Sequence, residues 1–119
     1  PVLPTKKALD ESLCAMQLLR MLGFPSDNLY LVLGTKEEPG MIRIAIREPG
    51  NSFSIPIGIT MEAPEEFQKK WEVAATAWNA MDSDAALQKF NQSTIHKEAP
   101  SIVASLLKSG FRLNTEATR

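Results

Sequence analysis

Hydrophobic and polar residues alternate in three short segments that turn signals separate. Met41–Arg47 places isoleucine at every second position, after Glu38-Pro39-Gly40 and before Glu48-Pro49-Gly50. Phe53–Ile59 alternates as strictly, and the apolar run Leu29–Leu33 precedes the first Pro-Gly. Pro-Gly favours turns, and period-two alternation between turns is typical of half-buried antiparallel strands. The pattern predicts a three-stranded antiparallel meander.

Strand order and faces follow from the same pattern. Pro56 has no backbone N–H, so its strand is predicted to lie at an edge and Met41–Arg47 in the centre. One face is then apolar and is expected to receive the helices: Leu29, Leu31, Leu33, Ile42, Ile44, Ile46, Ile55, Ile57 and Ile59. The opposite face is predicted to carry Tyr30, Val32, Arg43, Arg47, Ser54, Pro56 and Gly58.

Helical spacing appears on both sides of the meander. A first helix is predicted from Thr5 to Leu22, with its apolar stripe at Leu9, Leu13, Met16, Leu19 and Leu22. Pro64 suits the first position of a second helix, whose stripe is Phe67, Trp71, Ala74, Ala75, Trp78 and Met81. The two tryptophans are expected to cover the sheet as core; the alternative is an anchor for another chain.

Two shorter helices are predicted near the end of the chain. Asp82-Ser83-Asp84 interrupts the second helix, and a short helix follows with Ala86, Leu87 and Phe90. The last helix begins either near Ser93, with Pro100 inside it, or at Pro100. The whole of residues 1–119 is therefore predicted to be a single α+β domain: an N-terminal helix, a three-stranded meander, then two to three C-terminal helices on one sheet face.

Composition narrows the class of protein. The chain holds 13 basic and 14 acidic residues, for a net charge of −1, so bulk attraction to nucleic acid or anionic lipid is not expected. No apolar run has the length of a membrane span, and none follows Lys6 and Lys7 as in a signal peptide. Cys14 is the only cysteine and has no internal disulfide partner. We expect a soluble, cytoplasmic protein that does not bind membranes.

One surface is a candidate site. On the face opposite the isoleucines, Arg43 and Arg47 share a strand, with Tyr30 and Ser54 on the flanking strands. Two arginines beside a tyrosine could hold a phosphate, a carboxylate or a stacked base. The alternative is a solvated sheet face whose charges deter aggregation.

Catalytic and metal signals are weak. Cys14 and His96 could form a nucleophile pair only if the fold joined them, and Cys14 lies in an amphipathic stretch where a buried thiol is the usual finding. Pro1 carries a candidate amine base, but tautomerases that use such a proline place it at the head of a strand, unlike the helix expected here. We predict no catalytic residue, no metal site and no cofactor.

These observations favour a non-enzymatic protein–protein interaction module, such as an adaptor, chaperone or regulatory subunit. Exposed sheet edges commonly pair with another chain, so a protein partner or self-association, for example as a homodimer, is expected. One alternative is binding of nucleic acid or another anionic ligand by the Arg43/Arg47 face. Another is a small enzyme with no recognisable motif.

Overall fold

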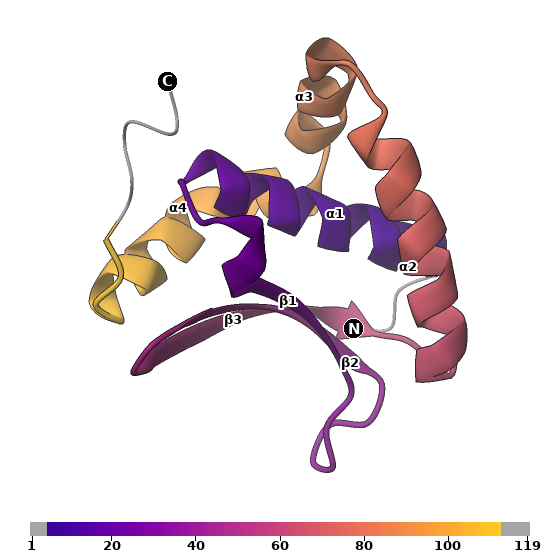
Figure 1. Ribbon diagram of the computed structural model, residues 1–119, viewed down its shortest axis with the longest axis horizontal. Coiled ribbons are helices and arrows are strands. Elements are labelled where there is room, and N and C mark those ends of the chain that lie inside the picture. The colour runs from indigo at the N-terminus through magenta and orange to yellow at the C-terminus, as the bar shows by residue number, and fades with distance from the viewer. Residues whose placement is uncertain (1–4, 113–119) are drawn as a thin grey trace.

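The computed structural model describes residues 5–112, so Pro1 lies outside the described part of the chain. The elements, in chain order, are α1 (Thr5–Met21), η1 (Ser26–Asn28), β1 (Leu29–Leu33), β2 (Met41–Glu48), β3 (Asn51–Ile59), α2 (Pro64–Asn79), α3 (Ser83–Asn91) and α4 (Thr94–Lys108). A helix, a three-stranded antiparallel sheet and three further helices confirm the predicted α+β arrangement (Figure 1).

The sheet has the predicted order β1-β2-β3, with β2 in the centre and both neighbours antiparallel to it. Ile42, Ile44 and Ile46 of β2 are fully buried because their side chains meet the helical layer. Figure 1 shows the four α-helices on this one side of the sheet.

The pairing of β2 with β3 contains an irregularity that the alternation did not predict. Arg43 pairs with Pro56, but the adjacent Ile42 pairs with Gly58, which leaves Ile57 as an extra residue on β3. Such a bulge bends the strand and interrupts the ladder locally. Pro56 itself lies opposite Arg43, whose backbone groups bond toward β1, so its missing amide falls on the open edge of β3.

The bulge reverses the two faces over the last residues of β3. Gly58, predicted for the outer face, lies opposite Ile42 and is buried. Ile59, predicted for the helix-covered face, pairs with Met41 and packs in neither cluster of the core. These two assignments were wrong, because one inserted residue flips every later side chain.

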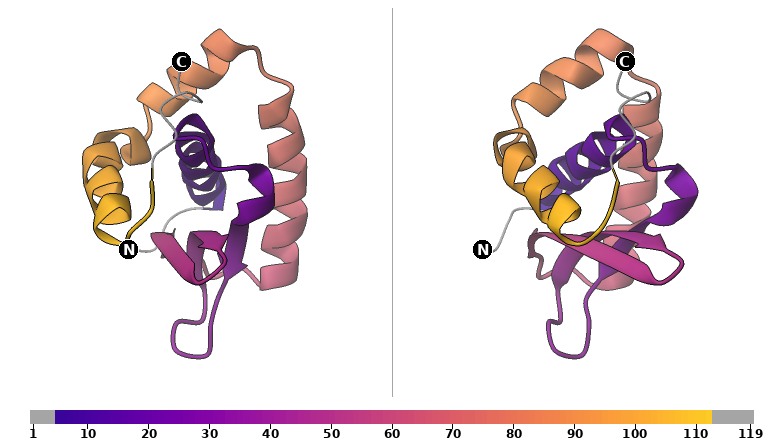
Figure 2. Two further views of the ribbon diagram at one scale, coloured as in Figure 1. Left: turned by 60° about the vertical axis from the view of Figure 1, so that its left-hand side comes forward. Right: turned by 90° about the vertical axis from the view of Figure 1, so that its left-hand side faces the viewer.

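Helix α1 is more deeply buried than its leucine stripe predicted. It contacts β2, β3 and all three other α-helices, and Figure 2 shows it running between α4 and α2 above the sheet. Its buried residues are Ala8, Leu9, Glu11, Ser12, Leu13, Cys14, Ala15, Met16, Leu18 and Leu19. The buried residues outside this stripe include Glu11 and Cys14, and Glu11 accepts hydrogen bonds from the first amides of α4.

The later helices bear on two predictions, the burial of the aromatic residues of the second helix and the start of the last helix. In α2 the ring of Phe67 is fully buried and Trp78 is 4% exposed, whereas Trp71 is half-buried at the rim of the core. Helix α4 begins after Ser93, whose hydroxyl accepts a hydrogen bond from the amide of His96, and it includes Pro100. The longer of the two alternatives for the last helix is therefore the observed one.

Candidate functional site

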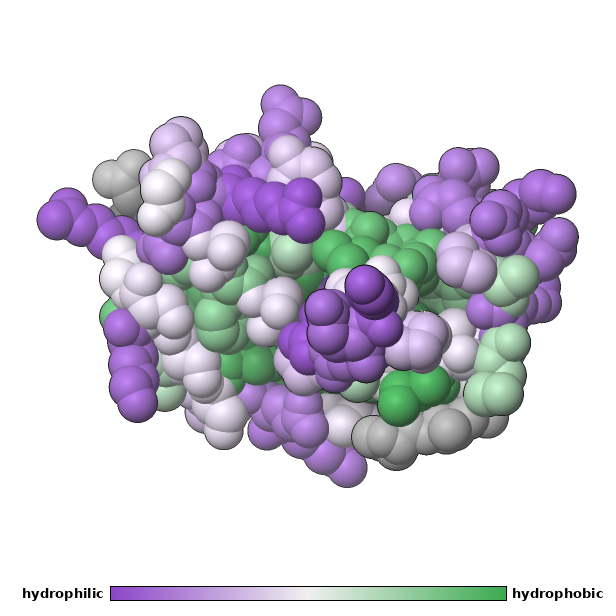
Figure 3. Space-filling view, turned by 90° about the horizontal axis from the view of Figure 1, so that it is seen from below, coloured by the Kyte–Doolittle hydropathy of each residue, from purple (hydrophilic) through white to green (hydrophobic). Residues whose placement is uncertain are grey.

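The face of the sheet opposite the helices is the outer face. It carries the four residues that the sequence nominated, Tyr30, Arg43, Arg47 and Ser54. Figure 3 looks onto this face from below: hydrophobic residues reach the surface among paler polar ones, and the hydrophilic β1–β2 loop projects toward the viewer. The structure groups the four residues into two separate pairs.

The first pair is Arg47 and Tyr30. Tyr30 lies opposite Ala45, so Arg47 is its diagonal neighbour across the β1–β2 ladder. The guanidinium carbon of Arg47 lies 4.9 Å from the centre of the tyrosine ring. This cation–π contact holds the cation over an exposed aromatic ring. Arg47 is exposed and forms no ion pair within residues 5–112, so its charge is open to a ligand.

The second pair is Arg43 and Ser54, joined by a third residue from the β1–β2 loop. Arg43 Nη1 donates to Ser54 Oγ at 3.2 Å, and Arg43 Nη2 donates to Glu38 Oε1 at 3.0 Å. The carboxylate balances the charge of Arg43 and ties the loop to the strand. Glu38 was identified from sequence only as part of a turn signal, and its role here depends on how the loop folds back.

Ala45 shows how tightly this face is built. It lies on the outer face of the central strand, yet it is only 5% exposed. Its direct partners across the sheet are Tyr30 on one side and Ser54 on the other. The centre of the outer face is therefore the buried, apolar side chain of Ala45, with one arginine on either side of it along β2.

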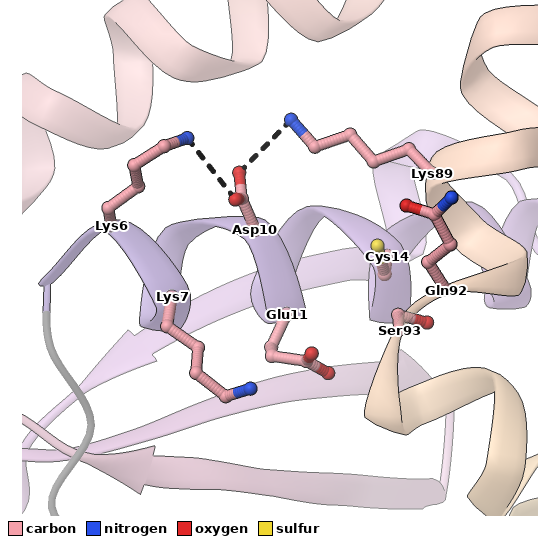
Figure 4. A pocket seen from close by; sticks show the side chains of 8 residues that line it. All are labelled: Lys6, Lys7, Asp10, Glu11, Cys14, Lys89, Gln92 and Ser93. Atoms are coloured by element: carbon pink, nitrogen blue, oxygen red, sulfur yellow. Dashed lines mark hydrogen bonds and ion pairs between the residues drawn. The ribbon is translucent and has the colours of Figure 1, made fainter.

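A second candidate is a pocket of about 440 Å³ between α1 and the α3–α4 junction. Figure 4 shows Lys6 and Asp10 on its upper side and Lys7 and Glu11 pointing toward the sheet. Asp10 is bonded to both Lys6 at 3.3 Å and Lys89 at 3.2 Å. The lining of this pocket holds three lysines against two acids, so one positive charge is left unbalanced.

The buried acid of this pocket, Glu11, has a structural partner that the sequence did not reveal. One of its carboxylate oxygens accepts from the amide of Thr94 at 3.1 Å and the other from the amide of Ile95 at 3.2 Å. Together with Ser93, it satisfies the first three amides of α4, and its negative charge meets the positive end of the helix dipole. A carboxylate on α1 thus fixes the start of α4, a pairing across more than eighty residues that no local signal indicates.

The thiol and the imidazole are not joined into a nucleophile pair. Cys14 is 1% exposed, and burial raises the pKa of its thiol from 9.0 to about 11, against a smaller opposite effect of a hydrogen bond with Ser93. His96 is exposed and stacks edge-on against Phe90, with ring centres 5.3 Å apart. A thiol that keeps its proton near neutral pH is a poor nucleophile.

Other signals add little. In the described part of the chain, no three His, Cys, Asp or Glu residues gather as a metal site would require. None of the helices within residues 5–112 is both long and apolar enough to cross a membrane. Comparison with protein-family models, with curated proteins and with solved structures finds no match to this chain.

Proposed function

We propose that this chain is a non-enzymatic interaction module whose outer sheet face binds an acidic, amphipathic helix of a partner protein. The observation that carries the proposal is the one-sided helical layer. It leaves the outer face open, with Arg47 laid on Tyr30 as an outward-facing cation. A sheet face with an apolar centre and a cation at its margin suits a partner helix that has an apolar side and acidic residues next to that side.

The size of the face supports one helix as the occupant. Three strands spaced about 4.8 Å apart give a surface roughly 14 Å wide, and a helix with its side chains is about 10–12 Å across. A strand of eight residues is roughly 26 Å long, so the face measures several hundred Å². That area is below the roughly 800 Å² per partner of a stable protein–protein interface, which favours a single docked element over a second globular surface.

The arginines differ in what they offer a ligand. Arg43 already pairs with Glu38, so Arg47 supplies the charge for an acidic partner. One such arginine, in a chain of net charge −1, gives little of the phosphate attraction on which nucleic-acid binding depends. Nucleic acid and small anions are therefore alternative outcomes of the test.

The test is site-specific photo-crosslinking in extract of the source cells. A photoreactive residue replaces Val32 on the outer face in one variant and exposed Lys97 of α4 in another. We expect the Val32 variant to capture a partner through an acidic helical segment, identified by mass spectrometry, and the Lys97 variant not to capture it. A synthetic peptide of that segment should bind the parent chain.

Charge reversal provides the matched control. Arg47→Glu should weaken binding of that peptide at least tenfold, whereas Lys97→Glu, with the same change in charge, should leave it unchanged. Equal capture at both positions, or peptide binding indifferent to Arg47→Glu, would contradict the proposal. Binding of mixed oligonucleotides that weakens steeply with salt would support the nucleic-acid alternative instead.

A further inference from the structure

The outer edge of β1 is unusual among exposed edges. Natural edge strands discourage pairing with proline, lysine or a bulge. The edge strand β3 has both Pro56 and a bulge, but Leu29–Leu33 has no proline, no charge and a regular register with β2. Within residues 5–112, β2 is the element that β1 contacts extensively. The last three residues of β1 are only half-buried.

The register shows which backbone groups of β1 point outward. The amide of Gly34 donates to the carbonyl of Met41 at 2.8 Å, in the same alignment as the pairs of β1 with β2. Because successive residues of a strand alternate in direction, Val32 and Tyr30 also bond toward β2. The N–H and C=O groups of Leu29, Leu31 and Leu33 therefore point away from the sheet.

We propose that this edge pairs with β1 of a second copy of the chain, antiparallel and about a two-fold axis at Leu31. Leu31 then faces Leu31 of the second copy, and Leu29 faces Leu33. The backbone groups of all three residues point away from β2. The amide of Leu29 is already bonded to the carbonyl of Ser26, so the new hydrogen bonds join Leu31 to Leu31 and the amide of Leu33 to the carbonyl of Leu29 in the second copy. The result is one continuous sheet of six strands.

The side chains agree with this register. On the outer face Tyr30 lies opposite Val32 of the second copy, an aromatic and β-branched pair of the kind that stabilises sheets. On the other face, half-buried Leu31 and Leu33 gain apolar neighbours.

Association is expected to be weak, because five paired residues bury less surface than a standard interface. Sedimentation of the purified chain should show a monomer–dimer equilibrium between roughly 10 μM and 1 mM. Amide exchange should change at the same concentrations. Leu31 and Leu33 should exchange quickly when dilute and become protected when concentrated, while Tyr30 and Val32 stay protected throughout.

Charge variants test the register itself. Tyr30→Lys with Val32→Lys sets lysines opposite each other and should lower association at least tenfold, and Tyr30→Glu with Val32→Glu should do the same. Mixing the two variants places Lys opposite Glu and should restore dimers. Gln88→Lys with Asn91→Lys, which adds the same charge at exposed positions of α3, should leave association unchanged.

Each readout can overturn the proposal. Monomers at all concentrations, protection of Leu31 already at dilution, or association that resists the lysines while the variants remain folded by circular dichroism would each exclude pairing through β1. These measurements use the purified chain alone, so they are independent of any acidic partner of the outer face.

Discussion

Cys14 shows how burial decides the chemistry of a single residue. Its thiol lies under the α3–α4 junction with a pKa raised to about 11, mainly because burial disfavours the thiolate. At pH 8 the fraction of thiolate should be about 100-fold lower in the folded chain than in the unfolded one, because two pH units separate the two pKa values. We expect iodoacetamide to alkylate Cys14 at least 100-fold more slowly without urea than in concentrated urea.

The same shift affects stability at high pH. Between pH 9.0 and about 11 the folded chain keeps the thiol proton that the unfolded chain loses. The contribution of Cys14 to stability is therefore complete below pH 9 and declines as the pH rises toward 11. Cys14→Ala should flatten this decline in urea titrations, and an unchanged pH profile would show that the thiolate is accommodated in the fold.

At the scale of the element, the contact between α1 and α4 rests on Glu11. Glu11→Ala removes the acceptor for the first two amides of α4 and should cost about 2–4 kcal/mol in the free energy of unfolding, measured by urea denaturation. The control is the adjacent acid: Asp10→Ala removes two partly exposed ion pairs and should cost less than about 1 kcal/mol. Equal losses would mean that Glu11 contributes charge alone and that water replaces it at the start of α4.

Elements with strong local signals were predictable from sequence, and their exceptions have physical causes. Alternation and Pro-Gly turns identified all three strands, and Pro56 correctly placed β3 at an edge. The bulge beside Pro56 was missed because alternation in a sequence assumes an uninterrupted ladder. Burial of a second side of α1 was missed because a stripe of leucines reports one face, whereas Glu11 and Cys14 become buried only through the packing of α3 and α4.

At the scale of the whole molecule, the candidate site was predictable as a set of residues but not as an arrangement. The alternation of side chains along each strand was enough to place Arg43, Arg47, Tyr30 and Ser54 on one face, because successive residues of a strand point to opposite sides of the sheet. Their division into two pairs depends on Glu38, which reaches Arg43 from a loop. Whether this face binds a partner stays a prediction.

The packing of the whole chain predicts an order in which its parts open. Helix α1 and strand β2 lie at the centre of the molecule, so their amides should exchange only when the chain unfolds globally. Helix α3 has nine residues and buries only Phe90 among them, so it should open locally and exchange first. Native-state hydrogen exchange in low concentrations of urea, followed residue by residue, measures this order.

The same experiment has an internal reference in the two ends of β3. Amides of β3 that pair with β2 before the bulge should exchange more slowly than those of Gly58 and Ile59 beyond it, because the ladder is interrupted there. Amides of α3 that exchange as slowly as those of Ile44 would show instead that the helical layer unfolds as a single unit. In that case the bond network of Asp10, Lys89 and Glu11 joins α1, α3 and α4 more strongly than their buried apolar contacts indicate.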